Sequence, residues 1–244
     1  MGATEKLLFE HIVNAQKVVS QHIIQTPVAY SKVLSEVVGE QIFIKLENQQ
    51  ITGSFKIRGA INAISNLTSE EKKAGVVALS TGNHGRGLAY AAKLMKIKCI
   101  ICMSELVPQN KVDGIKALGA EVRLIGTNQD EAQVEADRLS IEEGMTYVSP
   151  FDNVDVIAGQ GTLGLEIYKQ VPEINFAFVP LSGGGLICGV AKALKGLNPN
   201  IKVIGVSMDR GAAMYESQKA GKPIYVEEEE SLADALTGGI GLDN

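Results

Sequence analysis

The sequence predicts an α/β protein in which mostly parallel sheets are flanked by helices. Short apolar segments rich in β-branched residues alternate along the chain with longer segments of helical periodicity. The short segments carry few polar residues, which is typical of strands covered on both faces of a parallel sheet. At 244 residues, of which 45% are hydrophobic, the chain is long enough for one large domain or two small ones.

The expected strands and helices follow one another in alternation. Strands are expected at residues 41–47, 75–80, 97–103, 120–126, 145–150, 175–181 and 202–208. Helices are expected at residues 54–67, 85–95, 111–119, 129–144, 157–170 and 186–197. Ligands of parallel sheets bind beyond the carboxyl ends of the strands, so function is expected in the loops that follow strands.

The composition excludes several classes of partner. The net charge is −5, and the sequence has no basic runs with interleaved aromatic residues, which argues against a nucleic-acid or anionic-membrane surface. No run reaches the roughly 18 apolar residues of a membrane helix. Three cysteines and an N-terminus without an apolar signal core favour a reducing, cytoplasmic location. A small-molecule partner is therefore expected.

The clearest functional loop is SGGGL at residues 182–186, between an expected strand and an expected helix. Consecutive backbone N–H groups there can point at one anion, and glycine lets the backbone approach it closely, which is typical of a phosphate cradle. The loop lacks a lysine at GxxxxGK spacing, so ATP is not the expected owner of the phosphate. A tight turn would need only one glycine with positive φ, whereas Gly183, Gly184 and Gly185 in a row favour the anion.

A second loop, STGNHGRG, follows the expected strand at residues 75–80. It gathers polar side chains around Gly82 at a helix start: Ser80, Thr81, Asn83 and His84. Hydroxyl, amide and free N–H groups in such a place could hold a carboxylate or orient a ring hydroxyl. The alternative is an ordinary N-cap, in which Ser80 or Thr81 satisfies unpaired amides and His84 faces solvent.

Lys56 lies in the first turn of the expected helix at residues 54–67, where a positive charge opposes the helix dipole. Its neighbours at helical spacing are Gly59, Ala60 and Ala63, so the side chain leans toward a space and not toward a carboxylate. The ammonium form of such a lysine should be disfavoured, and the neutral amine is a nucleophile. A nucleophilic lysine together with a phosphate cradle predicts a Schiff base with pyridoxal phosphate. The alternative is an exposed lysine on an amphipathic helix.

The motifs GSFKIRGA, STGNHGRGLAYAAK and PLSGGGL, in this order, resemble the threonine/serine dehydratase family of fold-type II pyridoxal-phosphate enzymes. The resemblance runs from about residue 26 through KALGAEV to the final GGIGLDN, and it implies a two-domain, tryptophan synthase β-like fold. Within the family, LENQQITGSFKIRGA, ICMSELVPQNKV and VSMDRGAAM look most similar to hydroxyectoine-utilisation dehydratases.

The resemblance implies roles for individual residues. Lys56 would form the Schiff base with the cofactor and then act as the base at the substrate Cα. Besides Lys56, the cofactor would be held by Phe55, Asn83, Ser182, Gly183, Gly184, Gly185, Leu186 and Gly239. The substrate carboxylate would be received by Ser80, Thr81, Gly82 and His84.

The implied reaction is β-elimination of water and deamination of a β-hydroxy-α-amino acid, such as L-threonine or L-serine, to a 2-oxo acid and ammonia. Two alternatives stay open. One is a serine racemase, in which the Thr81 hydroxyl supplies the acid on the ring face opposite Lys56. The other is a truncated, non-catalytic homologue that binds the cofactor. Dimers are usual in similar families, so a homodimer is expected.

Two departures from the family pattern lead to further expectations. Family members commonly continue through another strand and helix that supply a serine or cysteine facing the pyridine nitrogen. This sequence ends at Asn244, so a domain truncated at its C-terminus is expected. Relatives that bind a divalent cation use acidic ligands after the strand corresponding to residues 202–208. Met208 stands where a carboxylate would be, so no metal is expected there.

We expect a large cofactor-binding domain from residues 1–67 and 145–244, and a small α/β domain at residues 68–144 that contributes the STGNHG loop. The cofactor would lie in the cleft between them. GQGTLG at residues 159–164 has the GxGxxG spacing of a dinucleotide site. No good strand precedes it, so close helix packing is the expected reason for its glycines.

Overall fold

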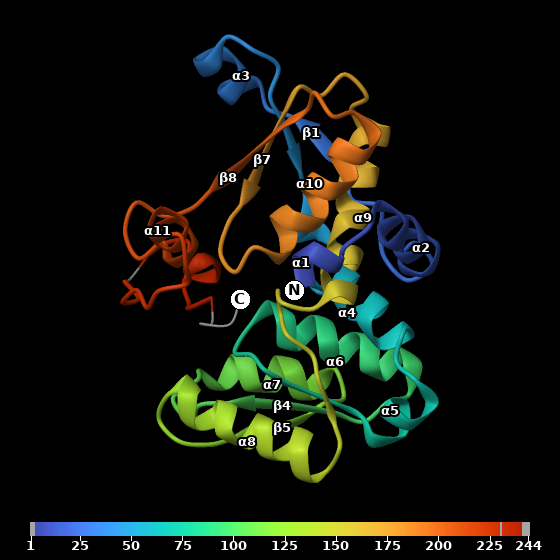
Figure 1. The fold of residues 1–244 in the computed structure, drawn as a ribbon, viewed down its shortest axis with the longest axis vertical. Helices are drawn as coiled ribbons and strands as arrows, with labels where there is room; N and C mark the ends of the chain where they lie inside the picture. The colour runs from blue at the N-terminus through green and yellow to red at the C-terminus, as the bar shows by residue number, and fades with distance from the viewer. Residues whose placement is uncertain (1–2, 230, 241–244) are drawn as a thin grey trace.

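The computed structural model describes residues 3–229 and 231–240. Helices and strands alternate along most of this part of the chain, and its strands form one four-stranded sheet and two two-stranded sheets. Figure 1 shows the four-stranded sheet with its helices toward one end of the molecule and the smaller sheets toward the other. The predicted α/β class with mostly parallel sheets is therefore confirmed.

The four-stranded sheet has the order β5-β4-β3-β6 and is parallel throughout. Its strands are β3 (Val76–Leu79), β4 (Cys99–Met103), β5 (Glu121–Leu124) and β6 (Thr146–Tyr147). They are connected in chain order by α6 (Asn83–Met95), α7 (Gln109–Ala117) and α8 (Gln129–Glu142). The two central strands, β3 and β4, are almost entirely buried. This is the burial expected of strands covered on both faces.

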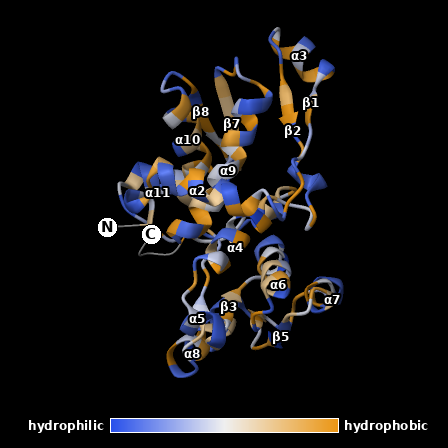
Figure 2. Cartoon of the chain, turned by 90° about the vertical axis from the view of Figure 1, so that its right-hand side faces the viewer, coloured by the Kyte–Doolittle hydropathy of each residue, from blue (hydrophilic) through white to orange (hydrophobic). Residues whose placement is uncertain are grey.

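The smaller sheets differ from the prediction in two respects. Their strands are β1 (Val28–Tyr30), β2 (Phe43–Lys45), β7 (Phe176–Pro180) and β8 (Lys202–Val206), and α10 (Gly185–Leu197) joins the last two. β1, which the sequence analysis did not predict, pairs with β2 in antiparallel fashion. β7 and β8 pair in parallel, but Phe176 and Phe178 are 51% and 62% exposed while Ala177 and Val179 are buried. One face of this sheet is thus open, and Figure 2 shows hydrophobic residues along β2 and β7.

The remaining elements surround these sheets. They are α1 (Ala3–Lys6), α2 (Phe9–Val19), α3 (Lys32–Val38), η1 (Glu47–Gln49), α4 (Lys56–Ser65), α5 (Ser69–Ala74), α9 (Val154–Gln170), α11 (Ala213–Ala220) and η2 (Asp234–Leu236). The sequence analysis predicted α4 and α9 and missed the others. For α5 a signal was present, because Thr68 and Glu71 form a capping box at its start. None of the helices in the described residues combines the length and apolar character of a membrane span.

Helices α4 and α9 pack with their backbones in close contact. A Cβ atom at Gly159 would lie 2.5 Å from Arg58 O, and one at Gly59 would lie 2.8 Å from Val156 O. Side chains larger than hydrogen at these positions would push the helices apart. The glycines of GQGTLG therefore allow close helix packing, as predicted, and this packing holds the start of α4 in place.

Gly159→Ala is expected to lower the free energy of unfolding by about 1–3 kcal/mol, because its methyl group would overlap the Arg58 carbonyl. Urea unfolding followed by circular dichroism measures this change. Gly114→Ala in α7 is a matched control, since a Cβ atom there meets nothing within 4 Å. That substitution should stabilise the protein by up to about 1 kcal/mol. Equal effects of the two substitutions would contradict the packing argument.

The sheet pairing bears on the predicted boundary at residue 145. β6 pairs with β3 through Val76 with Thr146 and Val77 with Tyr147. Residues 146–147 therefore belong to the four-stranded sheet and not, as predicted, with the elements that follow. The division of the chain into two domains itself stays a prediction.

Candidate active site

Lys56 is the first residue of α4, and its side chain is half-buried. Lys56 Nζ donates a hydrogen bond to Pro150 O at 3.1 Å and lies 5.4 Å from the centre of the Phe55 ring. Burial lowers the pKa of Lys56 from 10.5 to about 8. The ammonium form is disfavoured in the way that the sequence predicted, because a desolvated cation is costly.

Arg58, the second cation of this turn, is fully buried and paired with two carboxylates. Its guanidinium donates to Glu47 at 2.8 Å and to Glu166 at 2.8 Å, and Lys45 Nζ also donates to Glu166 at 2.8 Å. These hydrogen bonds and charges raise the pKa of Arg58 despite its burial. The carboxylates thus neutralise the arginine, whereas Lys56 forms no ion pair with a carboxylate of the described residues. Neither carboxylate was predicted: Glu47 lies in LENQQITGSFKIRGA but was given no role, and Glu166 lies outside every motif.

The glycine loop leads from β7 into α10, whose first N–H groups have no partner within the helix. Gly184, at φ 86°, is left-handed. Gly183 and Gly185 are required for another reason: a Cβ atom would lie 2.4 Å from Cδ1 of Phe151 in the first case and 2.8 Å from its Cα in the second. A turn explains one of the three glycines, and the close approach of Phe151 requires the other two.

The segment 148–151, between β6 and α9, connects the predicted parts of the site. Pro150 O accepts the hydrogen bond of Lys56, and the next residue, Phe151, packs against Gly183 and Gly185. The lysine and the glycine loop therefore meet at two consecutive residues. The sequence analysis did not identify Pro150 or Phe151, because the contact with Lys56 spans 94 residues of chain.

The STGNHG loop leads from β3 into α6, and α6 lies against the start of α4. A Cβ atom at Gly87 would lie 3.0 Å from the Lys56 carbonyl carbon, so the two helices touch at the lysine. Ser80 Oγ accepts hydrogen bonds from the N–H groups of Gly82 at 3.3 Å and Gly85 at 2.8 Å. Ser80 thus satisfies backbone amides at the helix start, as the alternative held, although the N-cap residue itself is Gly82.

His84, however, does not face solvent as the capping alternative predicted. It is 3% exposed, and its Nε2 lies 2.8 Å from Val148 O. A carbonyl only accepts, so Nε2 carries the proton. Burial, together with the nearby charge of Lys56, lowers the pKa of His84 to about 3, so the ring is neutral. The neutral ring then has a bare lone pair on Nδ1.

The other predicted residues are placed as follows. Thr81, Gly82, Asn83, Ser182 and Leu186 are half-buried, and Phe55 packs in the same hydrophobic cluster as Leu186. Gly239 is exposed, and a Cβ atom there would meet nothing within 4 Å, so the structure brings it against no other residue. Residues 241–244 of the GGIGLDN motif lie outside the described residues.

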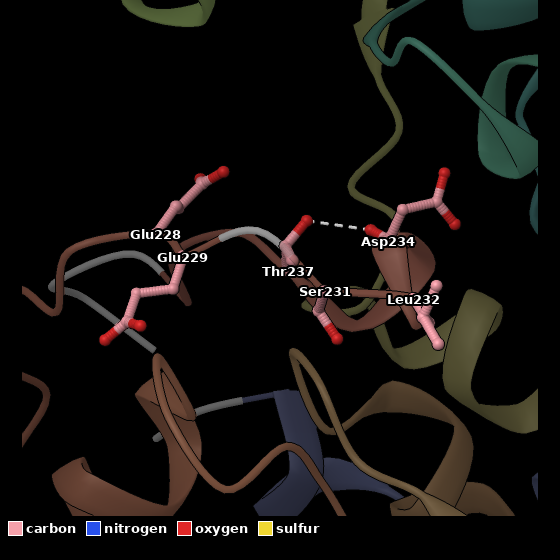
Figure 3. A pocket seen from close by; sticks show the side chains of 6 residues that line it. All are labelled: Glu228, Glu229, Ser231, Leu232, Asp234 and Thr237. Carbon is pink, nitrogen blue, oxygen red and sulfur yellow. Dashed lines mark hydrogen bonds between the residues drawn. The ribbon is translucent and has the colours of Figure 1, made fainter.

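A cavity of about 660 Å³ lies elsewhere, at the C-terminal segment. Figure 3 shows its lining residues, which are Glu228, Glu229, Ser231, Leu232, Asp234 and Thr237. Three carboxylates in this wall would repel a phosphate, and no predicted site residue lines it. In the described residues no group of three or more His, Cys, Asp or Glu side chains is placed to hold a metal ion. The expected absence of a metal stays a prediction.

The residues around Lys56 fit pyridoxal phosphate. The glycine loop offers backbone N–H groups at a helix start for the phosphate, and the Lys56 amine can react with an aldehyde. Five buried side-chain polar atoms have no hydrogen-bond partner in the described chain, and three of them lie around Lys56: Thr52 Oγ1, Ser54 Oγ and His84 Nδ1. Thr52 and Ser54 lie in the segment just before Lys56, and His84 is close enough for the charge of Lys56 to lower its pKa. Because buried polar atoms are rarely left unpaired, these atoms indicate space for a polar ligand.

In this α/β fold the lysine and the glycine loop at a helix start both contact the dipeptide Pro150–Phe151. Such an arrangement is typical of enzymes that anchor a phosphorylated aldehyde cofactor. The chain belongs to the pyridoxal-phosphate dependent enzymes, whose family matches residues 19–243. This confirms the predicted family and cofactor.

Individual relatives agree with this membership. The chain is 51% identical over 244 residues to a Sinorhizobium fredii protein assigned as a threonine dehydratase, covering 100% of this chain and 74% of that protein. It is 45% identical over 230 residues to the L-threonine ammonia-lyase of Thermotoga maritima, covering 94% of this chain and 57% of that protein.

Among solved structures, maize serine racemase matches with a TM-score of 0.92 at 36% identity over 96% of this chain and 71% of that chain. Threonine deaminase isoform 2 of Solanum lycopersicum matches with a TM-score of 0.90 at 39% identity over 95% of this chain and 64% of that chain. The predicted fold is thereby confirmed. The closer resemblance to hydroxyectoine-utilisation dehydratases stays a prediction.

Proposed function

We propose that this chain acts as a threonine/serine dehydratase, which converts a β-hydroxy-α-amino acid into a 2-oxo acid and ammonia. The observation that carries the proposal is the meeting of Lys56 and the glycine loop at Pro150 and Phe151. The relatives named as threonine ammonia-lyase and threonine dehydratase support this reaction class. The β-hydroxyl leaves as water, and hydrolysis then releases ammonia and the 2-oxo acid.

Each part of the site has a task in this reaction. Bound pyridoxal phosphate supplies a conjugated ring that accepts the charge left when the Cα proton is removed. Lys56 anchors the cofactor and takes that proton, for which a pKa of about 8 suits a general base. The backbone amides of the glycine loop, at the start of α10, hold the phosphate.

The start of α6 would bind the carboxylate of the substrate. The Thr81 N–H group and the Ser80 hydroxyl would receive the carboxylate at the positive end of the helix dipole, and the Asn83 amide would hold the ring oxygen of the cofactor. The Ser80 hydroxyl oxygen already accepts hydrogen bonds from two N–H groups, and its own proton is available for donation. Domain closure on the substrate would keep water from the reacting atoms.

The proposal is tested by adding pyridoxal phosphate to the purified protein and then threonine, serine or 3-hydroxyaspartate. A visible absorbance band should appear on cofactor addition, and threonine should yield 2-oxobutyrate and ammonia in equal amounts. The substrate with the highest kcat/KM identifies the natural class. A band without formation of a 2-oxo acid would identify the non-catalytic homologue, and the absence of a band would refute cofactor binding itself. Either result would make the dehydratase proposal wrong.

Serine racemase is the second candidate, supported by the match to the maize enzyme and by the presence of a hydroxyl at Thr81, the residue that we propose as the acid for the opposite ring face. D-serine formation measured beside pyruvate formation separates the two activities. Thr81→Ala should remove D-serine formation and leave pyruvate formation largely unchanged if Thr81 is that acid. We also propose a homodimer in the cytoplasm, with hydroxyectoine breakdown as the pathway to test.

A further inference from the structure

His84 connects the start of α6 to segment 148–151 through a hydrogen bond. Its Nε2–H donates to Val148 O at 2.8 Å, and the ring is 3% exposed. Two residues further on, Pro150 O accepts from Lys56 Nζ at 3.1 Å. One short stretch of backbone thus accepts a hydrogen bond from the STGNHG loop and another from Lys56.

This stretch also supports the glycine loop, since Phe151 packs against Gly183 and Gly185. Segment 148–151 has no long regular structure of its own, because β6 ends at Tyr147 and α9 begins at Val154. The Val148 N–H holds the start of the segment to β3 by donating to Val77 O at 2.9 Å, and side chains hold the carbonyl groups of Val148 and Pro150. Within segment 148–151, the Val148 carbonyl is held by His84 and by no other described side chain.

We propose that His84 is a positioning residue for Lys56: it holds the Val148 carbonyl so that Pro150 O keeps the lysine amine aimed at the cofactor site. The inference rests on the proposed function and adds a role to a residue that the resemblance assigned to the substrate carboxylate. That earlier assignment conflicts with the proton positions. Nε2–H is already used by Val148, and the bare lone pair of Nδ1 would repel a carboxylate.

The charges around Lys56 are compatible with this positioning role of His84. Arg58 is paired with Glu47 and Glu166, so it contributes little net charge at the lysine. His84 is the ionisable group of α6 that is electrostatically coupled to Lys56, and it is neutral through the physiological range. The hydrogen bond from His84 to Val148 O is therefore independent of pH above about 3.

Two variants test the inference. His84→Gln places an amide N–H the same number of bonds from Cα as Nε2, whereas His84→Leu has no donor. The first readout needs no turnover: the rate at which the cofactor-free protein takes up pyridoxal phosphate is followed by absorbance between pH 6 and pH 10. For the wild type this rate should reach half its maximum near pH 8, where the Lys56 amine loses its proton.

In His84→Leu we expect the uptake rate to reach half its maximum at a higher pH, because a displaced Lys56 amine would be better hydrated. We also expect kcat to fall by roughly 10–100-fold. The KM for threonine should stay within about twofold, because the ring does not bind the carboxylate. His84→Gln should restore the wild-type pH profile and most of kcat. A raised KM with unchanged kcat and pH profile would overturn the inference and restore the carboxylate role.

A wild-type measurement keeps the test independent of how the variants fold. The ¹⁵N chemical shifts of the histidine ring in the cofactor-free protein should show a neutral ring protonated on Nε2 from pH 7 down to about pH 5. Protonation on Nδ1 would overturn the inference. A wild type that takes up no pyridoxal phosphate would refute the proposed function, whereas loading that is identical in wild type and His84→Leu would refute only the positioning role.

Discussion

Lys56→Met is expected to raise the free energy of unfolding of the cofactor-free protein at pH 7 by up to about 3 kcal/mol, although it removes the reactive amine. Burial lowers the pKa of Lys56 from 10.5 to about 8 in the folded state, and one pKa unit corresponds to about 1.4 kcal/mol. The charged lysine therefore destabilises the fold at neutral pH. Methionine has a similar length and no charge, so the packing is kept while this cost is removed.

The pH dependence gives this prediction its sign. Between pH 8 and pH 10.5 the unfolded chain binds the lysine proton and the folded chain has released it, so the stability of the wild type rises with pH. The cost is present in full below pH 8 and disappears above pH 10.5. The difference in stability between Lys56→Met and wild type should therefore shrink to nearly zero across this range. A constant difference would mean that the charge of Lys56 is not its source.

Denaturant unfolding at several pH values, in the absence of cofactor, measures the difference. Lys45→Met is a matched control, because Lys45 donates to Glu166, Gln170 and Thr26 O, and its loss should destabilise the protein. With pyridoxal phosphate and threonine present, Lys56→Met should lose activity by about 10²–10⁴-fold or more, the usual contribution of a general base. Opposite changes in stability and activity identify Lys56 as a functional residue and not a structural one.

Local patterns were sufficient for the elements whose reason is local. The buried strands β3 and β4 and the helices that follow them were predicted from apolar runs and helical spacing, and the glycine loop was found because its unusual residues are consecutive. β1 was missed because its three residues stand between Pro27 and Ser31 without a longer apolar run, whereas β2, equally short, lies within the predicted run at residues 41–47. The open face of β7 and β8 could not be predicted either, since an apolar run does not tell which neighbours cover it.

The parts of the site that were missed depend on contacts between distant residues. Pro150 meets Lys56 across 94 residues, and Glu166 meets Arg58 across 108 residues. Neither residue belongs to a motif, so no pattern indicated it. The contact of His84 could not be predicted either, because only the fold shows that its Nε2–H donates a hydrogen bond to Val148 O.

Arg58→Met is expected to lower the free energy of unfolding by about 3–5 kcal/mol, because it leaves buried carboxylates without their partner. Arg58 is fully buried, and each of its two carboxylate partners, Glu47 and Glu166, lies 2.8 Å away. Lys45 would still neutralise Glu166, so the loss falls chiefly on Glu47, which keeps only the Thr26 hydroxyl. Urea unfolding at pH 7 measures the change.

Arg123→Met is the control for Arg58→Met, because Arg123 also pairs with two carboxylates, Glu121 and Glu135, but is partly exposed. Water screens such a pair, so its loss should cost less than about 1 kcal/mol. Equal losses in the two variants would show that burial of the Arg58 network is not what makes it stabilising. Arg58→Met should also leave the pKa of Lys56 low wherever the variant stays folded, since burial and not Arg58 sets that value. The uptake rate of pyridoxal phosphate against pH, measured below the unfolding transition, would then reach half its maximum near pH 8, as in the wild type.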